Sequence, residues 1–111
     1  MSKIVHENHW RWGREYTIII DGGIGFCRVA IEDDAPQTAF LMTVSIVEPE
    51  RRKGNGTKLV ECAKKQAKRA GAKGMFLWCA PELVEWYKRR GFVEATRERT
   101  QGGMVGMSLE L

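Results

Sequence analysis

A change of hydrophobic period near the middle of the chain limits its possible folds more than any other feature. Residues 39–47 are almost all apolar or β-branched, which indicates a central strand buried on both faces. Beyond a short glycine-containing segment, apolar residues recur three or four positions apart, at Leu59, Val60, Ala63, Ala67 and Ala70. This spacing predicts an amphipathic helix over residues 57–70 that Gly71 ends. A buried strand therefore leads directly into a helix.

The N-terminal part of the chain reads as β-structure. Two β-rich runs flank Gly22-Gly23, which predicts a hairpin with a two-residue glycine turn. Residues 33–37 combine two aspartates with a proline and break the second strand. The sequence therefore predicts a series of consecutive antiparallel strands before the central strand.

The C-terminal part alternates strand, helix and strands. Residues 74–80 form a short apolar strand, and Pro81 suits the first position of a following helix that Gly91 ends. Residues 92–111 read as two strands around the turn 101–103. The order predicts an α/β (α+β) fold with one mixed, mostly antiparallel central sheet of six to seven strands and two main helices. Trp78 and Trp86 are expected in its core.

The length and composition fit one small domain over residues 1–111. The chain has 111 residues, and its apolar runs are much shorter than the roughly 18 residues of a membrane helix. The charged N-terminus does not resemble a secretory signal. Three cysteines, an odd number without a close pair, argue against disulfides and zinc and favour a reducing compartment. We therefore expect a cytoplasmic protein with cysteines in its core, no metal and no membrane partner.

The positive charge is concentrated in one segment. Residues 51–73 contain nine Lys or Arg and one acid, whereas the remainder contains nine Lys or Arg and thirteen acids. Such a segment suits an anionic partner: nucleic acid, membrane headgroups or a phosphorylated cofactor. The alternative is a solvated helix face.

The segment 51–57 is the strongest local signal for a binding site. Its glycines, Gly54 and Gly56, allow a tight turn and a close approach of a ligand to the backbone. The free N–H groups at the start of the next helix favour an anion, and three cations precede them, at Arg51, Arg52 and Lys53. A pyrophosphate is the natural ligand. Only one residue separates the glycines, and Leu59 stands where a third glycine would be, so Walker and dinucleotide loops are excluded.

Taken together, these motifs resemble the GNAT acetyltransferase superfamily. A strand, Val47-Glu48-Pro49 and then Arg51-x-x-Gly54-x-Gly56 before a Lys-rich helix is similar to the acetyl-CoA loop of that family. Trp86-Tyr87-Lys88-Arg89-Arg90-Gly91-Phe92 is similar to its Tyr-x-x-x-Gly-Phe helix end. The resemblance covers about residues 14–111.

The resemblance implies both a ligand and a set of site residues. In this family the loop amides hold the pyrophosphate of acetyl-CoA, which assigns cofactor binding to Arg51, Arg52, Lys53, Gly54, Asn55, Gly56 and Thr57. The preceding strand separates from its neighbour, and the backbone near Ile46 and Val47 pairs with the pantetheine arm. Tyr87 would lie near the sulfur, where a phenol can protonate a departing thiolate. On the residues alone, the favoured interpretation of Tyr87 is an aromatic core residue that contacts Leu83 and Phe92.

Three departures from the family pattern affect the acceptor side. The two helices that usually lie between the first two strands are missing, so this side should be open or completed by a second copy in a homodimer. The stretch from Val47 to Gly54 is one residue shorter than usual. The central strand also lacks the usual glutamate base. Candidate substitutes are Ser45 acting through a water, Glu32, His6 and His9.

Three functions remain in order of preference. The first is direct transfer of an acetyl group from acetyl-CoA to a primary amine. The second is a coenzyme A-binding module with little or no catalysis. The third is a nucleic-acid binder, which we consider unlikely because the phosphate loop and a solvated helix already account for the basic residues. The sequence does not identify the amine.

Overall fold

Within residues 1–99 and 102–111, which the computed structural model describes, seven strands form one sheet in the order β1-β2-β3-β4-β5-β7-β6. Side chains are described for residues 1–95 and 102–111. The strands are β1 Lys3–Trp10, β2 Gly13–Ile20, β3 Gly25–Glu32, β4 Thr38–Ile46, β5 Gly74–Cys79, β6 Val93–Arg99 and β7 Val105–Glu110. The helices are α1 Asn55–Arg69 and α2 Val84–Lys88, with short 3-10 turns at Asp21–Gly23, Glu48–Glu50 and Pro81–Leu83.

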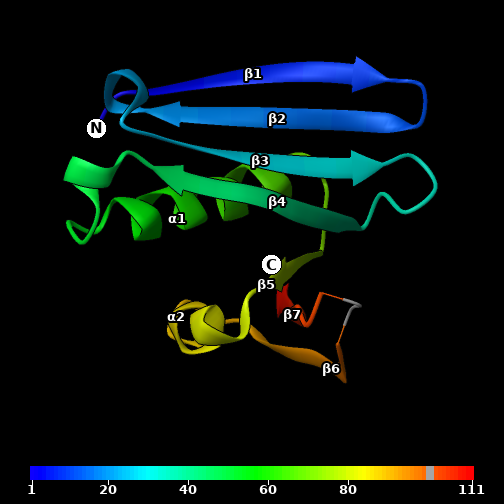
Figure 1. The fold of residues 1–111 in the computed structure, drawn as a ribbon. Coiled ribbons are helices and arrows are strands. Elements are labelled where there is room, and N and C mark those ends of the chain that lie inside the picture. Colours follow the sequence, from blue (N-terminus) through cyan, green and yellow to red (C-terminus); the bar gives the residue numbers. More distant parts are fainter. Residues whose placement is uncertain (100–101) are drawn as a thin grey trace.

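Strands β1 to β4 form an antiparallel meander along one side of the molecule (Figure 1). Only Arg11 and Trp12 connect β1 to β2, so no helix separates the first two strands. The hairpin at Gly22-Gly23 is confirmed, but its connection is longer than expected. Ile20 pairs with Gly25, which leaves four residues in the connection, and Asp21 also takes a positive φ of 47°.

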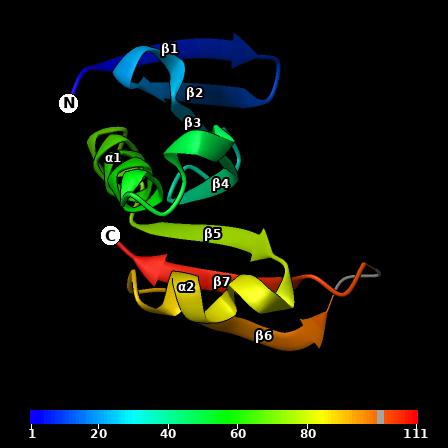
Figure 2. The same ribbon diagram turned by 60° about the vertical axis from the view of Figure 1, so that its left-hand side comes forward.

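The two helices pack against one core on the same face of the sheet. Helix α1 lies on β2, β3 and β4, and α2 lies on β6 and β7 (Figures 1 and 2). Alternate strand residues face this core, and the largest fully buried side chains include Ile18, Val29, Leu59, Met107 and Phe92. All three cysteines are free and buried in it, as expected.

The central strand β4 is buried on one face only, so the expectation of two buried faces is wrong. Ala39 and Leu41 are buried, but Phe40 is half-buried and Met42 is 61% exposed. The physical reason is that no helix among the described residues covers the face opposite α1 and α2. The apolar run in the sequence therefore reflects aromatic and β-branched residues on an open face.

Strands β4 and β5 run side by side for only a short distance. Their parallel pairing covers Thr38 to Phe40 against Gly74 to Phe76, although both strands continue further. A register shift in the β3–β4 pairing leaves Met42 as an extra residue, a bulge of the kind that bends a strand. The two strands separate beyond this point and leave a gap in the middle of the sheet.

The remaining expectations about the fold are largely confirmed. The sheet is mixed and mostly antiparallel, α1 begins two residues earlier than expected, and Gly71 and Gly91 follow the two helices with φ values of 96° and 98°. The tail forms two strands, although Gln101 in the expected turn lies outside the described residues. None of the described helices has the length and apolar character needed to cross a membrane.

Candidate active site

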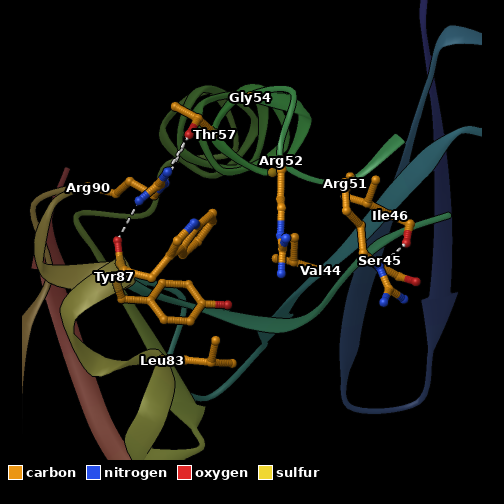
Figure 3. A pocket seen from close by; sticks show the side chains of 12 residues that line it. Val44, Ser45, Ile46, Arg51, Arg52, Gly54, Thr57, Leu83, Tyr87 and Arg90 are labelled. Carbon is orange, nitrogen blue, oxygen red and sulfur yellow. Dashed lines mark hydrogen bonds between the residues drawn. The ribbon is translucent and has the colours of Figure 1, made fainter. Parts of the chain in front are cut away.

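A hollow of about 700 Å³ lies between the end of β4, the N-terminus of α1 and α2 (Figure 3). We call it the arginine hollow because Arg51, Arg52 and Arg90 line it. Seven of the ten predicted site residues line it: Ile46, Arg51, Arg52, Gly54, Gly56, Thr57 and Tyr87. The fold therefore brings the phosphate-type loop and the tyrosine of the distant helix to one cavity.

The start of α1 presents backbone N–H groups at the edge of this hollow. Gly54 precedes the helix with a φ of 82°, a left-handed conformation that glycine adopts without strain. The first helical hydrogen bond runs from the Lys58 N–H to the Gly54 carbonyl at 3.1 Å. No side chain of the described residues caps this helix end, so its first N–H groups can receive an anion.

The two arginines before the loop take different positions. The Arg51 guanidinium donates a hydrogen bond from Nε to the Ile46 carbonyl at 3.0 Å. Arg52 has a φ of 64°, unusual for a residue with a side chain, and its side chain points into the hollow (Figure 3). This backbone conformation turns a cation toward the space in front of α1.

Three predicted site residues lie elsewhere. The Val47 side chain is exposed, and its N–H donates to the Ile24 carbonyl at 2.9 Å. The Lys53 ammonium lies 3.4 Å from the Glu50 carboxylate. The Asn55 side chain is buried and donates to the Glu50 carbonyl at 2.9 Å, which fixes the turn before α1. None of the three lines the arginine hollow as described.

The structure gives a different reason for a glycine at position 56 from the close approach of a ligand that the sequence suggested. A Cβ on Gly56 would lie 2.9 Å from Trp86 Cζ2, so the missing side chain makes room for the indole ring. The Arg90 guanidinium carbon lies 3.5 Å from the centroid of this ring. Arg90 also donates two hydrogen bonds to the Thr57 hydroxyl, at 2.6 and 3.0 Å. These contacts fasten α2 to the first turn of α1.

Tyr87 is half-buried at the far wall of the arginine hollow. Its ring packs edge-on against Trp86 and Phe92, with centroid distances of 4.9 and 5.6 Å. Burial raises the pKa of the Tyr87 phenol, the nearby Cys79 adds to this effect, and Arg90 opposes it. The hydroxyl points toward Val44 and Arg52 (Figure 3). The tyrosine is therefore held in place and keeps its proton at neutral pH.

A second, smaller hollow of about 280 Å³ lies in the gap between β4 and β5. We call it the apolar hollow because Leu41, Met42, Trp78 and Met104 contribute to its lining. It shares Val44, Leu83 and Tyr87 with the arginine hollow. Tyr87 thus lines both a cationic cavity and a mainly apolar one.

The candidate proton acceptors are widely separated. Ser45 lines the arginine hollow. Glu32 lies at the opposite end of the β3–β4 pair, and His6 and His9 are exposed on the edge strand β1. None of these three lines either hollow as described. Among the described residues, no group of three or more His, Cys, Asp or Glu is arranged to hold a metal ion.

Sequence reasoning missed four of the residues that line the arginine hollow as described: Val44, Leu83, Trp86 and Arg90. Ser45, which it named as a candidate proton carrier, also lines this hollow. Trp86 was expected in the core, and Arg90 was assigned to the helix dipole. The spacing of Trp86 and Arg90, four apart on a helix, was the available signal, because such residues share a face. Trp78, also expected in the core, is 47% exposed because its face of the sheet is uncovered.

The fold is similar to solved acetyltransferase structures. A Bacillus subtilis acetyltransferase in complex with CoA is 19% identical with a TM-score of 0.75, covering 98% of this chain and 97% of that one. An IAA acetyltransferase from Bacillus cereus is 18% identical with a TM-score of 0.72, covering 99% and 100%. A nourseothricin acetyltransferase is 19% identical with a TM-score of 0.69, covering 90% of this chain and 66% of that one. The chain therefore spans slightly less than two thirds of that enzyme.

The sequence itself gives a more direct assignment. A search of curated proteins found no match. The model of the acetyltransferase (GNAT) family matches residues 3–92, which includes β1 to β5, both helices and the loop before α1. Since this match covers most of the 111 residues, the chain belongs to the GNAT acetyltransferase family.

Proposed function

We propose that the protein transfers an acetyl group from acetyl-CoA directly to a primary amine. The observation that carries this proposal is that Tyr87 lines both hollows. One hollow offers cations and helix N–H groups, and the other is apolar. The arrangement suits a reaction in which a polyanionic thioester and a separate acceptor meet at the tyrosine.

The arginine hollow fits the phosphate part of acetyl-CoA. Arg51 and Arg52 line it, and the uncapped N-terminus of α1 supplies N–H donors beside them. Gly54 needs its left-handed backbone to expose these N–H groups, and a Cβ there would meet no atom within 4 Å. Helix N-termini and guanidinium groups are the ordinary protein ligands of phosphate. We assign the pyrophosphate to this corner.

Tyr87 is proposed as the general acid. Acetyl-CoA, when bound, supplies a thioester whose acyl carbon bonds to the amine nitrogen while its C–S bond breaks. The Tyr87 hydroxyl gives its proton to the departing sulfur, and the proton that the nitrogen loses returns through water to the Tyr87 phenolate. The products are an amide and a thiol, and the phenol is restored. Because the pKa of Tyr87 is raised, the phenol stays protonated until well into the alkaline range. Ser45, through a water molecule, is the candidate carrier of the proton from nitrogen.

The test combines a binding and a turnover measurement. Isothermal titration with CoA should show one site, and release of the free thiol should depend on an added amine. Tyr87→Phe keeps the ring and its packing against Trp86 and Phe92, so CoA affinity should not change. Its kcat should fall by about 10- to 1000-fold, the lower range typical of a general acid. Equal turnover of the variant and the parent would remove the tyrosine from the mechanism.

A second function is favoured by one specific observation. No Asp or Glu lines either hollow as described, so no carboxylate there takes the proton of an amine. A module that binds CoA without efficient catalysis would show the same titration and no amine-dependent thiol release. A short oligonucleotide in the same titration tests the less favoured nucleic-acid binder, and light scattering tests the homodimer.

A further inference from the structure

The lining of the apolar hollow restricts which amine can occupy it. Among the described residues that line it, none is Asp, Glu, Lys, Arg or His. Most of its side chains are apolar, with Leu41, Met42, Trp78 and Met104 among them, and the polar groups beside them are the uncharged side chains of Thr43, Cys79 and Tyr87. Such a surface gains free energy when it covers an apolar group, and none of its described side chains offers a carboxylate to a second ammonium group.

The apolar hollow passes through the sheet rather than lying on one side of it. The strand register places Thr43 opposite Arg28, on the uncovered face, and Trp78 alternates onto the same face. Val44 and Tyr87 lie on the side of the helices, where the arginine hollow begins. An acceptor can therefore enter from the uncovered face while the thioester approaches Tyr87 from the helix side.

Trp78 forms a supported wall at the entrance. Its ring packs edge-on against Phe76 with a centroid distance of 5.2 Å, and Phe76 packs against Phe40 at 6.1 Å. Trp78 is nevertheless 47% exposed, so part of its surface is free to contact a ligand. A large exposed aromatic that is fixed by its neighbours is typical of a recognition surface.

The size of the hollow limits the bound group. About 280 Å³ lies just under the range of about 300–1,000 Å³ found for drug-sized ligands. A hexyl or phenylethyl group fits this space, whereas an aminoglycoside exceeds it. A polyamine has a suitable width, but its second ammonium would lose water without gaining a carboxylate.

We propose that the acceptor is a primary amine carried by a compact apolar group, bound in the apolar hollow with its nitrogen toward Tyr87. This inference rests on the proposed acetyl transfer and adds the class of acceptor to it. The hollow recognises the apolar group by burial, and Trp78 and Met42 at the uncovered face determine the preference. Polyamines, aminoglycosides and lysine side chains in polar peptides are disfavoured.

The same surroundings help the amine to lose its proton. Removal of water from an ammonium group favours its neutral form, which is the nucleophile, so the missing strand carboxylate matters less. Among the residues whose side chains are described, the charged groups near the hollow lie outside its lining. Burial, and then the Glu94 and Glu82 carboxylates, raise the pKa of Cys79. Glu94 also lies 3.8 Å from the Lys88 ammonium, and Arg90 acts on Tyr87 from the helix side.

A matched pair of acceptors tests the proposal. Hexylamine and 1,6-diaminohexane have the same length and differ by one ammonium group. Hexylamine should have at least a tenfold higher kcat/KM, because burial of an unpaired charge opposes the diamine. In the presence of CoA, titration should also show binding of hexylamine and much weaker binding of the diamine. 2-Phenylethylamine should behave as hexylamine does.

Variants of Trp78 test whether the apolar hollow is the source of the preference for apolar amines. Trp78→Ala should raise the KM for hexylamine about five- to tenfold and leave the affinity for CoA unchanged, and Trp78→Phe should restore most of the loss. Trp12→Ala is the matched control, because Trp12 is 64% exposed and lies in the β1–β2 turn. Thermal melting of both variants should stay near that of the parent.

The outcomes separate the two proposals. A diamine that is used as well as hexylamine, or a Trp78→Ala variant with unchanged hexylamine kinetics, overturns the acceptor class and leaves acetyl transfer intact. Normal CoA binding without acetylation of any amine overturns acetyl transfer, and the acceptor class with it.

Discussion

Arg90 holds Thr57 by two hydrogen bonds from its guanidinium group to one hydroxyl, at 2.6 and 3.0 Å, across two helices that are far apart in the sequence. A third hydrogen bond runs from the same group to the Trp86 carbonyl at 2.6 Å. Burial, and then the neighbouring Arg89, lower the pKa of the Arg90 guanidinium, which stays charged at neutral pH. This contact fixes the first turn of α1 relative to α2.

Removal of the Thr57 hydroxyl should loosen this junction. Thr57→Val keeps the shape of the side chain but leaves two guanidinium N–H groups without their acceptor. The free energy of unfolding should fall by about 1–3 kcal/mol, the cost of an unsatisfied donor. Urea denaturation measures it, and Thr57→Ser, which keeps the hydroxyl, is the matched control. A Thr57→Val variant as stable as Thr57→Ser would show that the contact does not contribute.

Addition of one methyl group at Gly56 should move the Trp86 ring. A Cβ there would lie 2.9 Å from Trp86 Cζ2, closer than real contacts allow. Gly56→Ala should therefore lower the melting temperature and weaken CoA binding. Gly102→Ala is the control, because nothing lies within 4 Å of a Cβ at that position.

A double variant identifies the clash at Gly56 as the cause. If the ring of Trp86 is the obstacle, Gly56→Ala should cost much less stability in a Trp86→Ala background than in the parent. Additive effects in this cycle would contradict the packing explanation and support the original view that the glycine only makes room for a ligand.

Two neighbouring cations should differ in their effect on CoA affinity. Arg52 points into the arginine hollow, whereas the Lys53 ammonium lies 3.4 Å from Glu50. Arg52→Ala should weaken CoA binding by about 1.5–3 kcal/mol, the range for a charge-assisted hydrogen bond, and Lys53→Ala should change it little. Titration at 0.05 and 0.5 M salt should show weaker binding by the parent at high salt. Equal losses in both variants would indicate that only total charge matters.

Alkaline pH should destabilise the fold through Cys27. Burial, with a smaller contribution from Cys62, raises the pKa of the Cys27 thiol from 9.0 to about 12. Between these values the unfolded chain loses the proton and the folded chain keeps it. The stabilising effect is therefore complete below pH 9 and falls as the pH rises, by about 1.4 kcal/mol per pH unit at most.

Denaturation curves under reducing conditions at pH 8 to 11 measure this dependence. The parent should lose stability with pH more steeply than Cys27→Ala, which has no thiol at this position. The comparison concerns the slopes, since the cavity left by the substitution lowers stability at every pH. Parallel slopes would show that this thiol does not titrate as its burial indicates.

The spacing of apolar residues in the sequence predicted the helices and strands well. It predicted poorly which residues of distant elements meet in the candidate site. The strand–loop–helix segment and the ends at Gly71 and Gly91 depend on local geometry, which single residues determine. The contact between Gly56 and Trp86 depends on how two helices that are distant in the sequence pack together, and no local sequence pattern determines this packing. Trp78 was misplaced for a related reason: an aromatic in a strand has the same local preference on a covered or an open face.

The short pairing of β4 with β5 is the weakest connection within the sheet, between the strands β1 to β4 and the strands β5, β7 and β6. Three residue pairs join the meander and α1 to the block of β5, β7, β6 and α2, and the Arg90–Thr57 contact is a further link across it. The two sides share one apolar core, so the short strand pairing marks the place where the sheet itself resists local opening least. A ligand held in the gap contacts the β4 side and the β5 side at once. We therefore expect occupancy of the two hollows to stiffen the molecule across this gap.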